Sequence, residues 1–261
     1  MNDIFDMCGA EESAPTMPLI GDRAPEFVAE TTNGSVNFPA DYRGKWVILF
    51  SHPSDFTPVC TTEFMTFQAM VPEFRELNTE IIGLSIGTIT SHLAWLRDIQ
   101  TGVQFRDWKN MEITFPVIAD MKMDVARKYG MLHAAASDTM AVRAVFVIDP
   151  NGIIRTILYY PAALGRNFAE LKRILIGLQM SDAFGYSAPA DWTPGEDVLV
   201  SSPKTTAGVQ ERVKNTKSGW NVMTWFLTFA KLPADMLLAK IKSKPQEKPS
   251  KNTKKKITHF R

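Results

Sequence analysis

Apolar residues along this chain fall into short continuous runs and longer helical repeats. Residues 46–50 form an unbroken apolar run, which predicts a buried strand. Apolar side chains then recur at helical spacing and predict a helix from Pro58 to about Leu77, with a bend at Pro72. The same patterns predict strands over 80–86, 115–118, 143–149 and 153–160, and helices over 91–99, 124–129 and 168–178. This alternation of strands and helices favours a layered α/β fold.

The two ends of the chain differ from this central part. Residues 1–16 are polar and without periodicity, and from about Ser187 the chain becomes rich in proline, with no sustained strand pattern. We therefore predict four segments: a flexible leader (1–16), a main α/β domain (17–182), a smaller C-terminal arm or domain (183–239) and a basic tail (240–261). Low hydrophobicity, prolines and like charges predict that the tail is disordered.

The composition narrows the classes of protein to which the chain can belong. No apolar run approaches the roughly 18 residues of a membrane span, and the first residues are acidic where a signal peptide would be basic. We therefore expect a cytoplasmic protein. The two cysteines cannot form a disulfide framework, and the lack of a Cys-x-x-Cys pair argues against a zinc site or a dithiol thioredoxin. The four histidines show no metal-ligand spacing, so we expect no metal and no other cofactor.

Charge is unevenly distributed, although the formal total is only +1. Residues 240–261 hold eight lysines and one arginine against Glu247 alone, a net charge of +8, so the rest of the chain carries −7. A basic tail of this kind can contact nucleic acid or an anionic membrane. A solvated tail without a ligand is the simpler interpretation and the one that we favour.

Cys60 stands at the predicted start of the helix that follows the first buried strand. Thr57 suits the N-cap and Pro58 the first helical position, which makes Cys60 the third helical residue. Unpaired backbone N–H groups and the positive end of the helix dipole both favour a thiolate there. The sequence therefore predicts a reactive cysteine, the alternative being a small buried side chain that serves packing alone.

The residues around Cys60 also resemble the active-site motif of a known family. Pro53-x-x-x-Thr57-x-x-Cys60, followed by Thr61-Thr62-Glu63, resembles the peroxidatic motif of the peroxiredoxins. The longer run 50–64 resembles the one-cysteine (sixth-class) branch and its archaeal relatives. Three further matching segments follow in the expected order, at residues 141–149, 159–168 and 190–192. The whole resemblance extends from about residue 17 to about residue 225.

The resemblance implies a thioredoxin-like fold with peroxiredoxin insertions, plus a C-terminal dimerisation arm. It also implies that Cys60 attacks the peroxide, that Thr57 and Arg143 stabilise the reaction and that Pro53 shields the thiolate from water. A lowered thiol pKa raises the thiolate fraction but lowers nucleophilicity by a similar factor. A fast reaction therefore needs donors that stabilise the charge on the leaving oxygen. From the residues alone, Thr57 has a plainer interpretation as an N-cap, and Arg143 as a solvent-facing strand end.

Three further residues are implied as supporting the site. Glu63 lies one helical turn beyond Cys60 and is expected to hold an arginine in a bidentate pair, with a plain surface charge as the alternative. Arg166 corresponds to the second arginine of the family, although alone it would be taken for a solvated loop residue. For His52, a structural and a gating role are both open.

Cys8 marks a difference from the two-cysteine peroxiredoxins, which resolve the sulfenic acid with a second cysteine, usually downstream of the first. No cysteine follows Cys60 here, so we predict that an external thiol (thioredoxin-like, glutathione-like or other) resolves it. Cys8 can act as the resolving thiol only if the leader folds back or crosses between subunits. The chain contains no Gly-x-Ser-x-Gly, so the lipase-like activity of vertebrate one-cysteine members is not predicted.

Together these features predict a thiol-dependent peroxidase that reduces hydrogen peroxide and small alkyl hydroperoxides through a Cys60 sulfenic acid. The alternatives are a peroxide sensor or holdase chaperone, which would oxidise once and stall, and a two-cysteine variant that uses Cys8. The apolar cluster within 220–229 predicts burial against a second copy of the chain, as a homodimer or a ring of dimers. Contact of this cluster with a membrane surface is the alternative.

Overall fold

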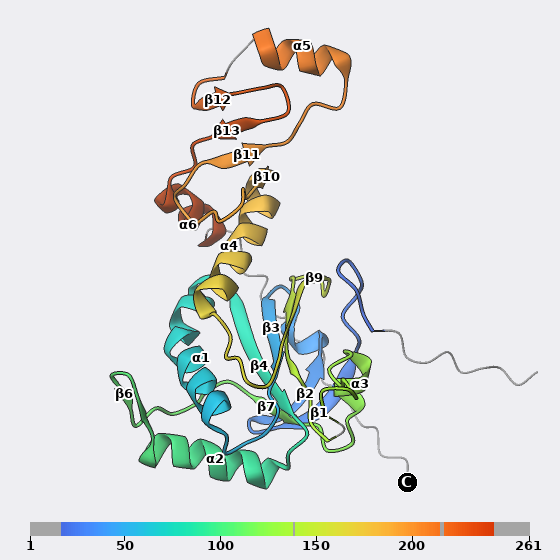
Figure 1. Ribbon diagram of the computed structural model, residues 1–261, viewed down its shortest axis with the longest axis vertical. Coiled ribbons are helices and arrows are strands. Elements are labelled where there is room, and N and C mark those ends of the chain that lie inside the picture. The colour runs from blue at the N-terminus through green and yellow to red at the C-terminus, as the bar shows by residue number, and fades with distance from the viewer. Residues whose placement is uncertain (1–16, 138, 215–216, 243–261) are drawn as a thin grey trace, which may run out of the picture.

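The computed structural model describes residues 17–137, 139–214 and 217–242 (Figure 1). The predictions for the leader with Cys8, and for the tail beyond Lys242, fall outside these described residues. None of the helices within them combines the length and the apolar character that a membrane crossing requires.

Seven strands form the central sheet, in the order β2-β1-β7-β4-β3-β8-β9. Strand β3 lies parallel to β4, and β4 lies parallel to β7, while the remaining neighbours pair antiparallel. Every residue of β3 and β8 is buried, which explains why both strands give continuous apolar patterns. The bounds are β1 (Phe27–Thr31), β2 (Gly34–Phe38), β3 (Trp46–Ser51), β4 (Thr79–Ser85), β7 (Val117–Ala119), β8 (Arg143–Ile148) and β9 (Ile154–Tyr160).

Helices cover both faces of this sheet. Helices α1 (Pro58–Glu76), α2 (Ile89–Gly102) and α4 (Phe168–Phe184) pack on one face, and the short α3 (Asp124–Lys128) packs on the other. Successive residues of β3 point to opposite faces, so that Ile48 and Phe50 join the core under α1 and α4, while Val47 and Leu49 join the core under α3. The α/β prediction is confirmed, and β3 lies near the middle of the layered structure.

The segment beyond α4 forms a second, smaller sheet, which extends away from the central one in Figure 1. Its order is β10-β11-β13-β12, and β11 and β13 pair antiparallel. The sequence showed no sustained strand pattern here, because strands of two or three residues are too short to give an alternating pattern. The bounds are β10 (Tyr186–Ser187), β11 (Val198–Val200), α5 (Thr206–Lys214), β12 (Trp220–Val222), β13 (Thr228–Ala230) and α6 (Ala234–Lys242).

Most predicted elements are present, with shifted ends. Helices α2 and α4 are both longer than predicted, and α4 continues until Gly185, which adopts a left-handed conformation with φ 69°. Pro72 lies within α1. Several elements were not among the predicted ranges, including the strands β5 (Gln104–Phe105) and β6 (Trp108–Lys109) and the 3-10 helix η1 (Ala40–Tyr42).

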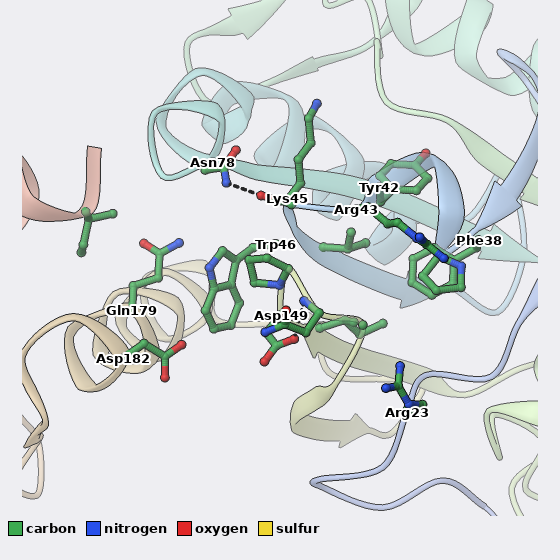
Figure 2. Close-up of a pocket in the computed structure, with 18 of the residues that line it drawn as sticks. Arg23, Phe38, Tyr42, Arg43, Lys45, Trp46, Asn78, Asp149, Gln179 and Asp182 are labelled. Carbon is green, nitrogen blue, oxygen red and sulfur yellow. Dashed lines mark hydrogen bonds between the residues drawn. The ribbon is translucent and has the colours of Figure 1, made fainter. Parts of the chain in front are cut away.

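A cleft of about 860 Å³ opens at the end of the sheet where β3 begins (Figure 2). Tyr42, Trp46 and Gln179 are among the residues that line it. Cys60 follows the opposite end of β3. The predicted site residues therefore gather at the other end of the sheet, away from this cleft.

Candidate active site

Cys60 lies in the first turn of α1, directly after the loop that leaves the central strand β3. Thr57 occupies the N-cap with an extended backbone (φ −110°, ψ 145°), and Pro58 is the first helical residue, as the sequence predicted. The Cys60 side chain is fully buried and is a free thiol. Cys60 therefore lies in the turn of a long helix whose backbone N–H groups lack partners within the helix.

The hydroxyl of Thr57 does not cap α1. It donates to the carbonyl oxygen of Ser54 at 2.9 Å instead, and its side chain accepts no hydrogen bond from the helix. The expected side-chain cap was therefore wrong, although the N-cap position was right. A hydroxyl has one proton and two lone pairs, so the Thr57 oxygen keeps acceptor capacity while its proton is already used.

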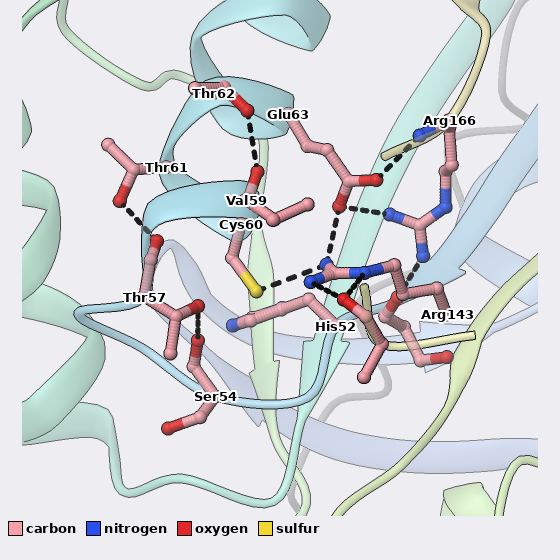
Figure 3. Close-up of polar contacts among 12 residues, drawn as sticks. His52, Ser54, Thr57, Val59, Cys60, Thr61, Thr62, Glu63, Arg143 and Arg166 are labelled. Carbon is pink, nitrogen blue, oxygen red and sulfur yellow. Dashed lines mark hydrogen bonds and ion pairs between the residues drawn. The ribbon is translucent and has the colours of Figure 1, made fainter. Parts of the chain in front are cut away.

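Arg143, the first residue of β8, reaches across to the cysteine. Its Nη1 lies 3.2 Å from Cys60 Sγ and 2.9 Å from Glu63 Oε2 (Figure 3). Its Nε and Nη2 both donate to the carbonyl oxygen of Ala162, at 3.1 and 2.8 Å. The residue is only 3% exposed, so the plainer interpretation of a solvent-facing strand end was wrong.

Glu63 connects two arginines beneath the cysteine. Its Oε2 accepts from Nη1 of Arg143 and, at 2.7 Å, from Nη1 of Arg166, while its Oε1 accepts from the backbone N–H of Arg166 at 2.9 Å. Glu63 is therefore no surface charge, and it is shared between two guanidinium groups rather than held by one bidentate arginine. Arg166 is buried as well, and it also donates to the carbonyl oxygens of Ser51 and Ala144.

The charges of this cluster favour an anion at the sulfur. Burial lowers the pKa of Arg166 to about 10, and the charge of Glu63 opposes that shift, so the guanidinium stays protonated at neutral pH. Two buried guanidinium groups then face one carboxylate, which leaves a net charge of +1. A thiolate at Cys60 would balance this charge.

His52 and Pro53 lie in the loop between β3 and α1, and both are buried. The His52 ring packs against Phe64, which is four residues beyond Cys60 on the same helix, at a centroid distance of 4.8 Å. Burial lowers the pKa of His52 to about 4, and its hydrogen bond to Asp55 only partly opposes the shift. The imidazole is therefore neutral at physiological pH.

The structure adds residues that the sequence did not single out. Asp55 lies behind His52 and contacts Ser91 and His92 from the start of α2. No pattern in the sequence joins positions 55 and 92, because the contact depends on how the loops after β3 and β4 meet. The Ala162 carbonyl was missed for a similar reason, since a main-chain acceptor leaves no trace in side-chain patterns.

Comparisons with known proteins show the family to which the chain belongs. Residues 20–157 match the model of the AhpC/TSA family, and residues 177–216 match the model of the C-terminal domain of 1-Cys peroxiredoxin. The chain is 57% identical to a peroxiredoxin of Methanosarcina mazei over 215 residues, which cover 82% of this chain and 98% of that relative. It is 44% identical to a peroxiredoxin of Aquifex aeolicus over 222 residues, covering 81% and 96% of the two chains.

Solved structures give the same result. A yeast mitochondrial 1-Cys peroxiredoxin superposes with a TM-score of 0.70 at 36% identity, covering 83% of this chain and 100% of its own. A cysteine-to-serine mutant of peroxiredoxin 6 of Arenicola marina superposes with a TM-score of 0.71 at 30% identity, covering 83% and 99%. These matches confirm the thioredoxin-like fold with a C-terminal domain, and the predicted class of enzyme, a thiol-dependent peroxidase. The chain belongs to the AhpC/TSA family as a peroxiredoxin of the one-cysteine branch.

Proposed function

We propose that this peroxiredoxin reduces hydrogen peroxide and small alkyl hydroperoxides through a sulfenic acid on Cys60, which an external thiol then reduces. The observation that carries the proposal is the 3.2 Å contact between Arg143 Nη1 and Cys60 Sγ, within a buried cluster of net positive charge. A preorganised cation at this distance can stabilise the thiolate and also the charge that develops on an attacked peroxide.

The proposed reaction has two stages. The Cys60 thiolate attacks the distal peroxide oxygen, the O–O bond breaks, and the sulfur is oxidised by two electrons to a sulfenic acid. The leaving oxygen takes a proton and departs as water or alcohol. One external thiol then condenses with the sulfenic acid to give a mixed disulfide and water, and a second thiol releases reduced Cys60.

The surrounding groups have separate parts in the first stage. Arg143 and the backbone N–H of Cys60 donate toward the peroxide oxygens, while Glu63 and Arg166 hold the Arg143 guanidinium in place. Because the Thr57 proton is committed to Ser54, we assign the Thr57 oxygen the part of an acceptor that orients the peroxide O–H. Pro53 and His52 close the pocket from the loop side and keep water from the sulfur.

Intact-mass spectrometry tests the proposed route. Wild-type protein, Cys60→Ser and Cys8→Ser each receive one equivalent of hydrogen peroxide without reductant. We expect wild type and Cys8→Ser to gain one oxygen, and Cys60→Ser to gain none. A wild-type Cys8–Cys60 disulfide, absent from both variants, would instead indicate the two-cysteine route.

Steady-state turnover separates an enzyme from a sensor or holdase. With a supplied thiol, the proposed peroxidase consumes many equivalents of peroxide, whereas a sensor oxidises once and stops. The family membership and the buried, cation-paired sulfur both support the enzyme, so the sensor is not the favoured alternative.

We also propose that residues 183–239 form a dimerisation arm. Met223 is 64% exposed, and the adjacent Trp225 and Phe226 are 42% and 56% exposed, all three on the segment that joins β12 to β13. Large apolar side chains gathered on one surface mark an interaction site, and a second copy of the chain is the partner that we propose. Sedimentation of wild type and Trp225→Ser over a range of concentrations tests this: the variant should dissociate at higher concentration.

The remaining proposals concern the compartment and the ends of the chain. A mechanism that depends on a free thiol suits a reducing compartment, and we propose the cytoplasm. The flexible leader, the disordered basic tail and the segment boundaries at 16/17, 182/183 and 239/240 stay predictions.

A further inference from the structure

A buried carboxylate, that of Asp55, lies behind the His52 ring. The side chain of Asp55 is 4% exposed and accepts three hydrogen bonds. The donors are His52 Nε2 at 3.0 Å, His92 Nδ1 at 2.8 Å and Ser91 Oγ at 2.6 Å. Asp55 and His52 belong to the loop before Cys60, whereas Ser91 and His92 belong to the first turns of α2. The carboxylate thus joins the loop of the reactive cysteine to a separate helix.

The protonation of the His52 ring follows from its partner. Burial would raise the pKa of Asp55, but the hydrogen bonds from His52, His92 and Ser91 outweigh burial and hold it well below its ordinary value. An ionised carboxylate only accepts, so the proton of the neutral His52 ring is on Nε2. The other nitrogen, Nδ1, is buried, has no hydrogen-bond partner among the described residues, and is then an unprotonated acceptor.

Both ring nitrogens of His92, unlike those of His52, contact a hydrogen-bond acceptor. Its Nδ1 faces Asp55 Oδ2 at 2.8 Å, and its Nε2 faces the carbonyl oxygen of Ile118 at 3.3 Å. Both partners are acceptors, so both contacts are hydrogen bonds only when the ring carries two protons. His92 thus lies between the Asp55 carboxylate and the main chain of β7.

The backbone around this cluster is tightly constrained. Phe56, next to Asp55, has a left-handed conformation with φ 55°, which is uncommon for a residue with a bulky side chain. At Gly87, an added Cβ would lie 2.9 Å from His92 Cε1 and 3.2 Å from Asp55 Oδ2, so no side chain fits there without displacing the pair. A loop held in such a conformation needs contacts that over-determine it, and the bonds of Asp55 supply them.

We propose that Asp55 is a positioning residue of the peroxidase site, which fixes His52 in its Nε2–H form and anchors the loop 52–57 to α2. The loop 52–57 leads directly into the first turn of α1. By fixing this loop, Asp55 determines where the Thr57 oxygen and Cys60 Sγ lie relative to Arg143. The inference rests on the proposed function, because the rate that reports on it is the reaction of Cys60 with peroxide.

Nitrogen-15 NMR of the histidine rings tests the protonation states in the reduced, full-length wild type. Signals are assigned with His52→Gln and His92→Gln. At pH 7 we expect His52 with one protonated nitrogen, Nε2. The groups that face His52 are Asp55 on its own loop, His92 on α2 and Arg166 before α4. Because the pKa of His52 is lowered to about 4, its ring should stay singly protonated between pH 5 and 8. An Nδ1–H form of His52 at pH 7 would overturn the proposal.

Kinetics of Asp55→Asn test the positioning role. Asparagine has nearly the same shape but offers one acceptor and an N–H donor, so at least one of the two rings must turn or change its protonation. We expect the second-order rate of Cys60 oxidation by hydrogen peroxide to fall about 100-fold, the loss that displacement by about 1 Å causes. Ser91→Ala, which removes one of the three bonds, should give a smaller loss and keeps the test open if Asp55→Asn does not fold.

Asp120→Asn is the matched control. Asp120 is also buried and accepts from the backbone N–H groups of Val125 and Ala126 at the start of α3, which packs on the other face of the sheet from α1. This variant should lose stability and keep the wild-type rate. A folded Asp55→Asn with a wild-type rate would refute the positioning role. If Cys60→Ser still reduced peroxide, the proposed function would fail instead, while the ring signals would still report on Asp55.

Discussion

Arg143 donates from a single nitrogen to both the sulfur of Cys60 and the carboxylate of Glu63. Its other two nitrogens are fixed on the Ala162 carbonyl, so the guanidinium cannot turn without breaking several bonds at once. We propose that this guanidinium meets the peroxide; it is already held in place before a substrate arrives, which is the condition for electrostatic stabilisation at low reorganisation cost.

Arg143→Lys should lower kcat/KM for hydrogen peroxide by about 10²–10³-fold, because an ammonium cannot reproduce the planar fork that binds Cys60, Glu63 and Ala162 together. Stopped-flow measurement of peroxide reduction checks this. Arg155→Lys is the control, since Arg155 pairs with Asp149 and Asp182 on a partly exposed surface. Equal rates for the two variants would contradict the assignment of Arg143.

Glu63→Gln should destabilise the fold by about 3–5 kcal/mol, because it leaves two buried guanidinium groups without their shared counter-charge. Denaturant unfolding of the reduced protein measures the loss. Glu73→Gln, which breaks an exposed pair with Lys172 on the same helix, should cost about 1 kcal/mol or less. A similar small loss at Glu63 would show that the buried charges are compensated in another way.

Thr57→Val should slow the reaction with peroxide by about 10²-fold, whereas Thr57→Ser should stay within about 10-fold of wild type, because serine keeps the hydroxyl oxygen that we assign as an acceptor. Single-turnover kinetics of both variants decide the matter. The side chain makes no helix cap, so neither substitution should change thermal stability by the amount typical of a lost N-cap. Equal rates in Val and Ser variants would remove Thr57 from the mechanism.

The stability of the reduced protein should fall between about pH 6.5 and pH 4 through His52. The folded-state pKa is lowered to about 4, so the unfolded chain takes up a proton at higher pH than the folded one. Above the unfolded-state pKa of about 6.5, the neutral His52 makes its full contribution to the free energy of unfolding. As the pH falls from about 6.5 to about 4, about 3 kcal/mol of that contribution is lost. Denaturant unfolding at several pH values checks the window. His52→Gln should flatten that part of the curve.

Much of this architecture could be predicted from the sequence, because the signals were local. The run at 46–51, the Thr57-Pro58 helix start and the apolar repeat of α1 act within a few residues, and they placed Cys60 correctly. Arg143 and Arg166 needed family resemblance, since a buried arginine looks like a surface one until its partner is known. The three bonds of Asp55 and the two-residue strands of the C-terminal sheet could not be predicted. Both depend on contacts between distant segments rather than on a repeating pattern.

The sharing of Glu63 between two arginines has a consequence for the catalytic cycle. In the proposed cycle, the charge of the cluster is balanced while the sulfur is a thiolate, but a sulfenic acid is neutral, so oxidation would leave one positive charge unbalanced in the protein interior. The fully buried sulfur cannot meet a bulky reductant in this conformation. If the proposed cycle holds, this unbalanced charge destabilises the packing that encloses Cys60, so the first stage favours the opening that an external thiol needs in the second.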